Sequence, residues 1–253
     1  MNFRWDIIVN YMPLFLQGAK VTLQVTVIAV VLGTLLGLFL GIARLARVKH
    51  GIWKYVVSIF VRWPAILYIT FFRGTPLFVQ ILIVHFGLMP ILINQTDGLL
   101  ISGELARQIK LAETGMLSGV FFSGVVALTL NSGAYIAEIF RAGIQSIDRG
   151  QTEAARSLGL TYAKTMRYII IPQAFRRMLP PLGNEAIMLL KDSSLVSAVG
   201  LGELAYAART AFGATSRVWE PYLTISLMYL VMTLGLSILV AWLERRYGTS
   251  DSR

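Results

Sequence analysis

The chain has 253 residues, of which 56% are hydrophobic and 14% are charged, and its formal net charge is +10. A soluble domain carries about 25% charged residues, so this composition excludes a water-soluble globular fold, and its hydrophobicity excludes a disordered chain. The absence of cysteine excludes disulfides, thiolate metal sites and cysteine nucleophiles. The composition therefore predicts a membrane protein, whose basic excess fits either the positive-inside rule or an anionic partner.

Four windows of 23 or 24 residues contain no charged side chain, namely 21–43, 74–96, 114–137 and 221–243. A helix of that length rises about 35 Å, which exceeds the roughly 30 Å hydrocarbon core of a bilayer. The first window is longer than a signal-peptide core of about 7–15 residues. We therefore interpret all four as retained membrane spans.

Two further hydrophobic stretches carry charges. The stretch 53–72 is interrupted by Arg62, and it is either a separate span or an interfacial lead-in to the next one. The stretch 180–201 contains Glu185, Lys191 and Asp192. Charges are costly in lipid, so we expect this helix to lie inside the bundle, facing protein or a watery cavity.

The distribution of basic residues predicts the topology. Sixteen of the 23 Lys and Arg residues lie in 44–62, 138–192 and 244–253, which the positive-inside rule places in the cytoplasm. This requires one span within 53–96, because two would turn 138–192 outward. We predict a single all-α, polytopic domain over residues 1–253, with the N-terminus outside and the C-terminus in the cytoplasm. Its five transmembrane helices are expected at about 14–44, 55–92, 114–140, 180–201 and 221–245.

The cytoplasmic stretch 148–172 is predicted to form two short helices. Asp148 followed by Gln151 resembles a capping box, and a helix over 151–158 places Ala154, Ala155 and Leu158 on one narrow face. Gly159 then breaks the helix. By this pattern alone the loop either lies on the membrane surface or docks on a soluble partner.

A second helix is predicted to begin with Thr161 as its cap and to run to about Ile171. Pro172 is expected to end or bend it.

These residues resemble a known signature. Glu153-Ala154-Ala155, then Gly159, Ile169 and Ile171-Pro172 match the EAA loop of ABC importer permeases, except that Ile171 replaces the usual leucine. The segments 73–80 (RGTPLFVQ), 131–143 (NSGAYIAEIFRAG) and 181–200 are similar to those of the polar amino acid branch. The resemblance extends from about residue 14 to 246, while the polar insertion 94–113 is longer than the family core requires.

The resemblance implies a type I ABC importer permease in the cell membrane, paired with a second permease copy or a paralogue. It implies coupling to a separate pair of ATPase subunits, which hold ATP and Mg, through the EAA loop. An extracellular or periplasmic binding protein would deliver a polar amino acid. The coupling residues carried over to this chain are Glu153, Ala154, Ala155, Leu158 and Gly159.

Several catalytic motifs are missing from the sequence. It has no phosphate-binding G-x-x-x-x-G-K-[ST] and no G-x-S-x-G, and its two histidines, His50 and His85, form no HExxH pair. We therefore expect a chain that is not an enzyme and holds no cofactor or metal, with ATP hydrolysis on a separate polypeptide.

Polar residues within the spans are candidates for a substrate pathway, because a zwitterion in the membrane needs hydrogen-bonding partners for both of its ends. The candidates are Asn131, Tyr135, Glu138, Asn184, Glu185, Lys191 and Asp192. A structural interpretation stays open for several of them. Glu138 pairs equally well with Arg141, and Lys191 with Asp192 or with Glu185 across a dimer.

Four residues are interpreted as structural. Arg73 is either a buried ion-pair partner, which we favour, or a carboxylate ligand. Pro76 is expected to kink the second span, Gly74 to let that bend form, and Pro172 to end or bend the second loop helix. The glycines at 33, 37 and 41 have the small-xxx-small spacing of close helix packing.

One rival function remains from the sequence, an ion-coupled secondary amino acid carrier that uses Glu138 and Lys191 and needs no ATPase. Binding of nucleic acid is not expected, because the basic residues fall between spans rather than on a soluble domain.

Overall fold

The structure is a computed structural model, and it describes residues 3–46, 51–93, 96–111 and 118–247. Within these ranges every regular element is helical, apart from a single β-bridge between Ile93 and Ile101. The all-α prediction is therefore confirmed for the described residues. In chain order the helices are α1 (Trp5–Leu45), α2 (Trp53–Val57), η1 (Ser58–Arg62), α3 (Trp63–Gly74), α4 (Leu77–Leu82), η2 (Ile83–Leu88), α5 (Met89–Leu92), α6 (Gly103–Leu111), α7 (Gly119–Gln145), α8 (Arg149–Ser157), α9 (Tyr162–Thr165), η3 (Met166–Ile170), α10 (Ile171–Asp192), η4 (Ser193–Val199), α11 (Leu204–Thr215) and α12 (Trp219–Tyr247).

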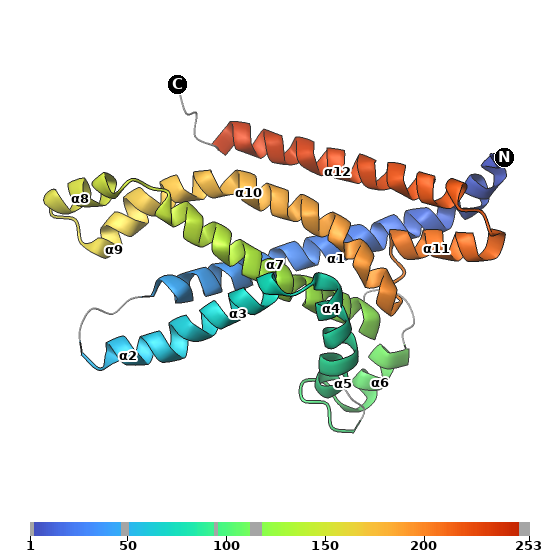
Figure 1. The fold of residues 1–253 in the computed structure, drawn as a ribbon, viewed down its shortest axis with the longest axis horizontal. Coiled ribbons are helices and arrows are strands. Elements are labelled where there is room, and N and C mark those ends of the chain that lie inside the picture. Colours follow the sequence, from blue (N-terminus) through green and yellow to red (C-terminus); the bar gives the residue numbers. More distant parts are fainter. Residues whose placement is uncertain (1–2, 47–50, 94–95, 112–117, 248–253) are drawn as a thin grey trace.

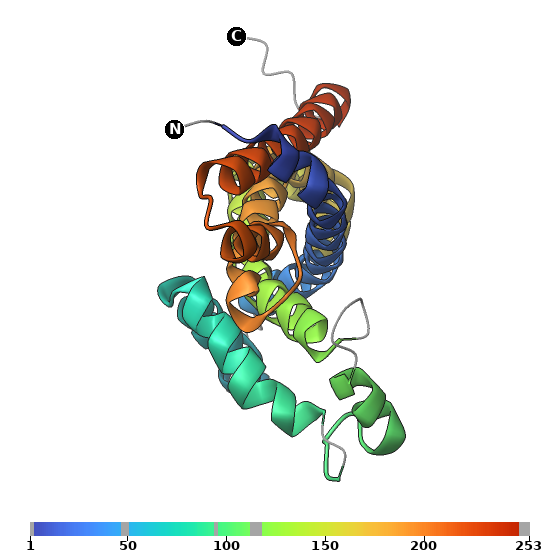
Figure 2. The same cartoon turned by 90° about the vertical axis from the view of Figure 1, so that its right-hand side faces the viewer.

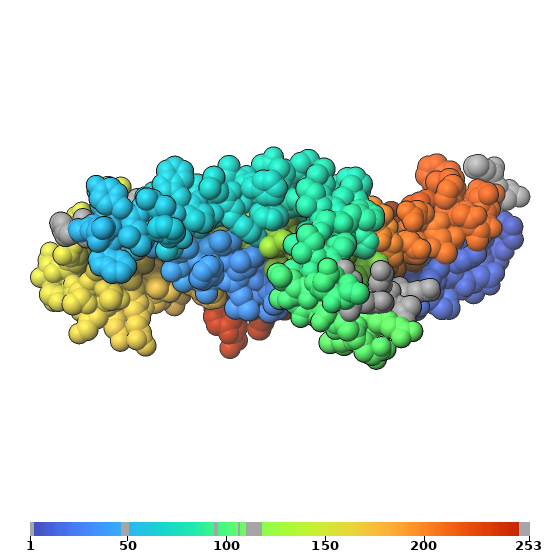
Figure 3. All heavy atoms as spheres, turned by 90° about the horizontal axis from the view of Figure 1, so that it is seen from below, coloured from blue at the N-terminus to red at the C-terminus, as the bar shows by residue number. Residues whose placement is uncertain are grey.

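The molecule is elongated, with α1, α7, α10 and α12 running roughly along its length (Figure 1). Helices α8 and α9 lie at one end, and α11 lies with the N-terminus at the other. Helices α4 and α5 run across the long axis instead (Figures 1 and 2). From below, α2 to α5 cover one face of the bundle between those two ends (Figure 3).

Four helical stretches of the described chain are long and apolar enough to cross a membrane, namely Trp5–Leu45, Trp53–Gly74, Gly119–Gln145 and Trp219–Tyr247. The predicted span at 180–201 corresponds to α10 and η4, which are absent from this set and carry Glu185, Lys191 and Asp192.

The second predicted span, 55–92, is two helices. The stretch treated as a possible lead-in is the long one, Trp53–Gly74, and a shorter apolar helix, Leu77–Leu92, follows it.

The chain breaks between these two helices rather than kinking. Gly74 ends α3, and both Thr75 (φ −119°, ψ 149°) and Pro76 (φ −65°, ψ 133°) are extended. Proline restricts the residue before it to extended conformations, so Thr75 cannot continue the helix. Gly74 has no positive φ. The predicted kink at Pro76, with Gly74 as its flexible point, is therefore corrected to a full break that Thr75 and Pro76 produce.

Helix α1 packs along α7 through its glycines. A Cβ atom added to Gly37 would lie 2.6 Å from Cγ2 of Ile136, and one added to Gly33 would lie 2.1 Å from Oγ of Ser132. No real side chain tolerates such distances, so the two backbones approach as closely as the small-xxx-small spacing predicts. This pair of helices forms the centre of the bundle.

Three π-helical turns accommodate prolines. The turns η1, η2 and η3 each end two residues before a proline, at Pro64, Pro90 and Pro172 respectively. Proline lacks an N–H group and its ring clashes with the carbonyl four residues earlier, and a widened turn at that point lets the helix continue. Pro172 lies in the first turn of α10, and the helical path continues through it. Of the two predicted outcomes at Pro172, an end or a bend of the loop helix, the end is therefore corrected.

Candidate functional site

The loop between α7 and α10 forms the predicted pair of short helices. Oδ1 of Asp148 accepts a hydrogen bond from the Gly150 amide at 2.7 Å, so Asp148 caps α8. Gln151 does not complete a capping box, because its Oε1 faces Gln173 Nε2 at 3.5 Å. Gly159 has a φ of +82°, a left-handed conformation that suits glycine at the end of a helix. Thr161 caps α9, as predicted.

The exposed side of α8 differs from the predicted face. Ala155 is buried, with 2% of its surface exposed, and α8 packs against η3. Glu153 and Ala154 are exposed, and Leu158 has 83% of its surface exposed. The three residues predicted to share a face are therefore divided, with Ala155 inward and Ala154 and Leu158 outward.

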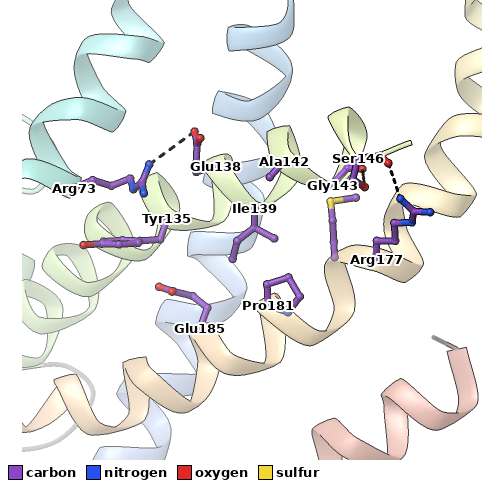
Figure 4. Close-up of a pocket in the computed structure, with 11 residues that line it drawn as sticks. Arg73, Tyr135, Glu138, Ile139, Ala142, Gly143, Ser146, Arg177, Pro181 and Glu185 are labelled. Carbon is purple, nitrogen blue, oxygen red and sulfur yellow. Dashed lines mark hydrogen bonds and ion pairs between the residues drawn. The ribbon is translucent and has the colours of Figure 1, made fainter. Parts of the chain in front are cut away.

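A cavity of about 490 Å³ lies between α7 and α10, with α3 at its edge (Figure 4). Its polar lining comes from Arg73 on α3, from Tyr135 and Glu138 on α7, from Ser146 directly after α7, and from Arg177 and Glu185 on α10. Pro181 and Ile139 supply apolar surface between them. The cavity volume lies within the range of about 300–1,000 Å³ that is typical of small-molecule sites.

Glu138 lies at the centre of a cluster of arginines. Its Oε1 accepts a hydrogen bond from Nε of Arg141 at 2.8 Å, and its Oε2 forms an ion pair with Arg44 on α1. Nη1 of Arg73 lies 3.9 Å from the same Oε2, and the Arg73 guanidinium stands over the Tyr135 ring at 5.4 Å from its centroid. The predicted pairing of Glu138 with Arg141 is present.

One carboxylate thus faces three guanidinium groups. Of the three arginines, Arg73 makes the longest contact with Glu138 and has 41% of its side chain exposed, against 26% for Arg44 and 27% for Arg141. Arg73 therefore has the most donor capacity left for a ligand in the cavity.

Glu185 extends into the cavity from α10, on the side facing α7 (Figure 4). It is half-buried and makes no ion pair within 4.0 Å among the described residues. Arg177 is exposed, and its Nη1 donates to the carbonyl oxygen of Ser146 at 2.6 Å. The cavity therefore presents a cation with spare donors on α3 and an unpaired carboxyl group on α10.

Asn131 does not line this cavity. It is buried, and its Nδ2 donates to Oε1 of Gln80 at 2.9 Å and to the carbonyl oxygen of Phe72 at 3.4 Å. Nε2 of Gln80 in turn contacts the carbonyl oxygens of Phe72 (2.8 Å) and Thr75 (3.0 Å) and the hydroxyl of Thr75 (2.9 Å). These two amides, the Gln80–Asn131 pair, satisfy carbonyl groups that the break after α3 leaves without helical partners.

Of the seven residues predicted to line a substrate pathway, the cavity is lined by Tyr135, Glu138 and Glu185 and not by Asn131, Asn184, Lys191 and Asp192. Asn184 and Lys191 are exposed on α10, and Lys191 makes no ion pair within 4.0 Å in the described part of the chain.

The predictions did not assign Gln80, Arg44 or Arg177. The sequence signal for Gln80 is a lone amide in an apolar run directly after Gly-Thr-Pro. Arg44 and Arg177 had no such signal, because basic residues near the ends of spans are common.

Long apolar helices around a charged cavity, with a helix pair extending from one end, define a multi-pass membrane transport subunit. The sequence profile of one family matches residues 33–249. The chain belongs to this family, the inner membrane components of binding-protein-dependent transport systems. The resemblance predicted from the EAA loop is confirmed.

Relatives of known role align over almost their entire length. The arginine transport system permease protein ArtQ of Bacillus subtilis is 35% identical over 99% of this chain and 100% of its own. The glutamine transport system permease protein GlnP of Escherichia coli is 36% identical over 97% and 98%.

Solved structures agree on the fold. A crystal structure of an amino acid ABC transporter with histidines contains a chain that is 40% identical, with a TM-score of 0.79 over 97% of this chain and 100% of that one. The methionine transporter MetNI, in an inward-facing conformation, has a TM-score of 0.71 at 18% identity over 94% and 98% of the two chains.

Proposed function

We propose that this chain is the membrane-spanning subunit of an ATP-driven importer that translocates a polar amino acid, which a binding protein delivers from outside the cell. The observation that carries the proposal is the cavity between α7 and α10, where Arg73 and Glu185 offer opposite charges to one small ligand. A free amino acid has a carboxylate and an ammonium group, and in the membrane both need partners. The names of the relatives ArtQ and GlnP support a substrate of this class.

In this proposal Arg73 binds the substrate carboxylate and Glu185 its ammonium group. Glu138 then has a supporting role, since its carboxylate is already held by Arg44 and Arg141 and it keeps Arg73 within 3.9 Å. The Tyr135 ring supports the Arg73 guanidinium from its other side at 5.4 Å.

The proposed topology has five spans, with α10 and η4 as the fifth membrane crossing in addition to the four apolar helices. Tryptophans tend to lie at the two membrane–water interfaces. Trp5 and Trp219 are exposed at the beginning of α1 and α12, and Trp53 and Trp242 are exposed near the opposite end. This distribution supports membrane interfaces near the two ends of the bundle. The orientation proposed for a cell membrane, with the N-terminus outside and α8, α9 and the C-terminus in the cytoplasm, rests on the basic residues of 44–62, 138–192 and 244–253.

Coupling to an ATPase is proposed to occur at α8. Leu158 extends from its end with 83% of its surface exposed, next to exposed Glu153 and Ala154. An apolar side chain this exposed suits a hydrophobic pocket of a partner protein. Gly159 provides the turn, and buried Ala155 seats α8 on η3.

The path from the loop to the cavity is a continuous helix. Helices α9, η3 and α10 follow one another without interruption from Tyr162 to Asp192. Glu185 lies 23 residues beyond Tyr162, or roughly 35 Å at the helical rise. A displacement of α8 by its partner is thereby transmitted to the cavity wall, which is how ATP and Mg on a separate ATPase would act without a cofactor in this chain.

A second permease copy or a paralogue would complete the transporter. Asn184 and Lys191 are exposed on α10 outside the cavity and are available to that partner subunit. Of the two predicted partners of Lys191 across the dimer, Asp192 is the proposed one, because Glu185 is assigned to the ammonium group of the substrate.

The test of the proposal is Leu158→Asp, with Leu99→Asp as its matched control, because Leu99 is an exposed leucine (75%) outside the loop. Each variant is expressed with the ATPase and the binding protein. Leu158→Asp should abolish co-purification of the ATPase and ATP-driven uptake, and Leu99→Asp should preserve both. Unchanged assembly and uptake in Leu158→Asp would overturn the docking claim.

The ion-coupled secondary carrier is the alternative function. It predicts uptake that persists without any ATPase and disappears with the ion gradient. Uptake into vesicles, measured with ATP and an uncoupler and then with a gradient and no ATP, distinguishes the two functions.

A further inference from the structure

A second cavity, of about 480 Å³, is lined by residues of α1, α7 and α11. The α11 end of the molecule lies opposite α8 (Figure 1). It is enclosed by α1 over residues 14–24, by the beginning of α7, and by the segment 200–207 that leads into α11. It shares no lining residue with the cavity of Arg73 and Glu185.

The wall contributed by α1 is a polar stripe. At 100° per residue, five polar side chains lie within an arc of about 80° on this helix. They are Asp6, Asn10, Gln17, Lys20 and Gln24, of which the last three line the cavity. Farther along α1 the same face becomes apolar, with Val31 and Leu35 exposed. The polarity of the helix therefore ends where the cavity ends.

The three polar side chains of this stripe that line the cavity have no partner within the described protein, whereas Asp6 pairs with Arg4. Gln17 and Lys20 are exposed to solvent. Within the described part of the chain, the side chains of Gln17, Lys20 and Gln24 make no hydrogen bond or ion pair, although Gln24 is half-buried. Unpaired amides and an ammonium group gathered around one cavity are groups that a bound ligand would satisfy.

Among the described residues that line the cavity, Lys20 is the only charged one, so their net charge is positive. The nearest acid along the chain, Glu203, is fully buried and already bonded. Its Oε1 accepts from the Tyr206 amide and its Oε2 from the Tyr229 hydroxyl, both at 2.7 Å. The electrostatics therefore favour an anion.

We propose that this second cavity is a binding site for a small carboxylate, which here is the free amino acid on its way to the cavity of Arg73. Lys20 donates to the carboxylate, and the amide oxygens of Gln17 and Gln24 accept from the ammonium group. The described lining contains no Asp or Glu, so the ammonium group of the amino acid is bound weakly. Weak binding suits a site that the substrate occupies only briefly. The identity of the ligand rests on the proposed function, whereas the carboxylate chemistry does not.

The experiment measures reductive methylation of individual lysines in the assembled transporter by mass spectrometry, without ATP. The probe is L-glutamine, and L-glutaminamide, which lacks the carboxylate, is its control. Saturating L-glutamine should slow methylation of Lys20 at least threefold, and L-glutaminamide should not. Lys164 on α9 is the internal reference and should react at the same rate throughout.

Two variants separate binding from folding. Gln24→Leu should remove the protection of Lys20. Asn10→Leu, on the same stripe but outside the cavity lining, should retain it. Both variants should melt at the temperature of the parent protein.

The proposal would be overturned if L-glutamine did not slow the methylation of Lys20, or if L-glutaminamide slowed it equally. It would also be overturned if Lys20 did not react in the absence of both probes, because another subunit would then cover it. Protection by ligand-free binding protein would also overturn it, since a protein carboxylate would then occupy the site. Uptake assays are scored separately. If the transporter takes up the amino acid but L-glutamine does not slow the methylation of Lys20, only this site is refuted. If L-glutamine slows that methylation but no ATP-driven uptake occurs, only the proposed function is refuted.

Discussion

The break between α3 and α4 offers the sharpest test of the structure, through the substitution Gln80→Leu. The side chain of Gln80 is almost fully buried, with 2% of its surface exposed, and leucine has a similar size. The substitution removes the contacts of Nε2 with Phe72 and Thr75 and takes away the acceptor of Asn131. The substitution therefore nearly preserves the shape of the side chain at position 80 while it removes the hydrogen bonds of Gln80.

The magnitude follows from the groups left without partners. The Phe72 carbonyl keeps Asn131 at 3.4 Å, and the Thr75 hydroxyl still donates to the Phe71 carbonyl at 2.8 Å. The Thr75 carbonyl and one N–H of Asn131 lose the partner that Gln80 supplied. Each unsatisfied buried group costs about 1–3 kcal/mol, so Gln80→Leu should destabilise the protein by about 2–6 kcal/mol.

The assay is thermal unfolding of the purified protein in detergent, followed by tryptophan fluorescence. At about 2–4 °C per kcal/mol for a chain of this size, Tm should fall by at least about 4 °C. Gln24→Leu is the matched control, since Gln24 is also a glutamine within an apolar helix but makes no hydrogen bond in the described chain. A Tm for Gln80→Leu equal to that of the parent, or an equal loss in Gln24→Leu, would refute the reasoning.

Three further predictions test packing, topology and charge. Gly37→Ala should lower Tm and Gly87→Ala should not, because a Cβ added at Gly37 would lie 2.6 Å from Cγ2 of Ile136, whereas one added at Gly87 would meet no atom within 4 Å. Equal Tm values would contradict the α1–α7 packing. Since the chain has no cysteine, single cysteines at Leu99 and Leu158 can be labelled with an impermeant maleimide in intact cells. Label should reach Leu99→Cys and not Leu158→Cys, and the reverse would invert the topology. Glu138→Gln should destabilise the protein by about 1.5–3 kcal/mol in denaturant titrations, because two arginines lose their charged acceptor; a parent-like midpoint would show that the ion pairs contribute nothing.

The loop around α8 shows which structural features can be predicted from local sequence. Asp148 and Thr161 cap their helices and Gly159 adopts a left-handed conformation, as the sequence indicates. Caps and turns depend on residues within one or two turns of the chain, so short-range reasoning finds them. Local sequence did not predict that Ala155 faces inward, because both faces of α8 contain small or apolar residues. Only the contact of α8 with η3 distinguishes the buried face from the exposed one.

The prolines likewise show what local sequence does not predict, namely whether a helix continues through a proline or breaks there. Pro172 and Pro76 both predict an interruption, yet α10 continues through the first and the chain breaks at the second. A proline removes one hydrogen bond from a helix, and η3 supplies a widened turn that accommodates Pro172. Pro13, Pro180 and Pro181 lie inside α1 and α10 without such a turn. At Pro76 the amide of Gln80, held by Asn131 from α7, stabilises the open carbonyls instead. Asn131 is 51 residues from Gln80 in the chain, so the sequence around Pro76 does not show this partner.

By itself the sequence determined the membrane class, the helical fold and the family, because these follow from composition, apolar window length and the spacing of the EAA-type loop. Only the tertiary structure decided which polar residues act together. Asn131, Tyr135 and Glu138 lie on one stripe of α7, but Asn131 supports the break after α3 while the other two line the cavity. A buried polar group must find a partner, and the identity of that partner depends on which helix packs beside it rather than on its neighbours in the chain.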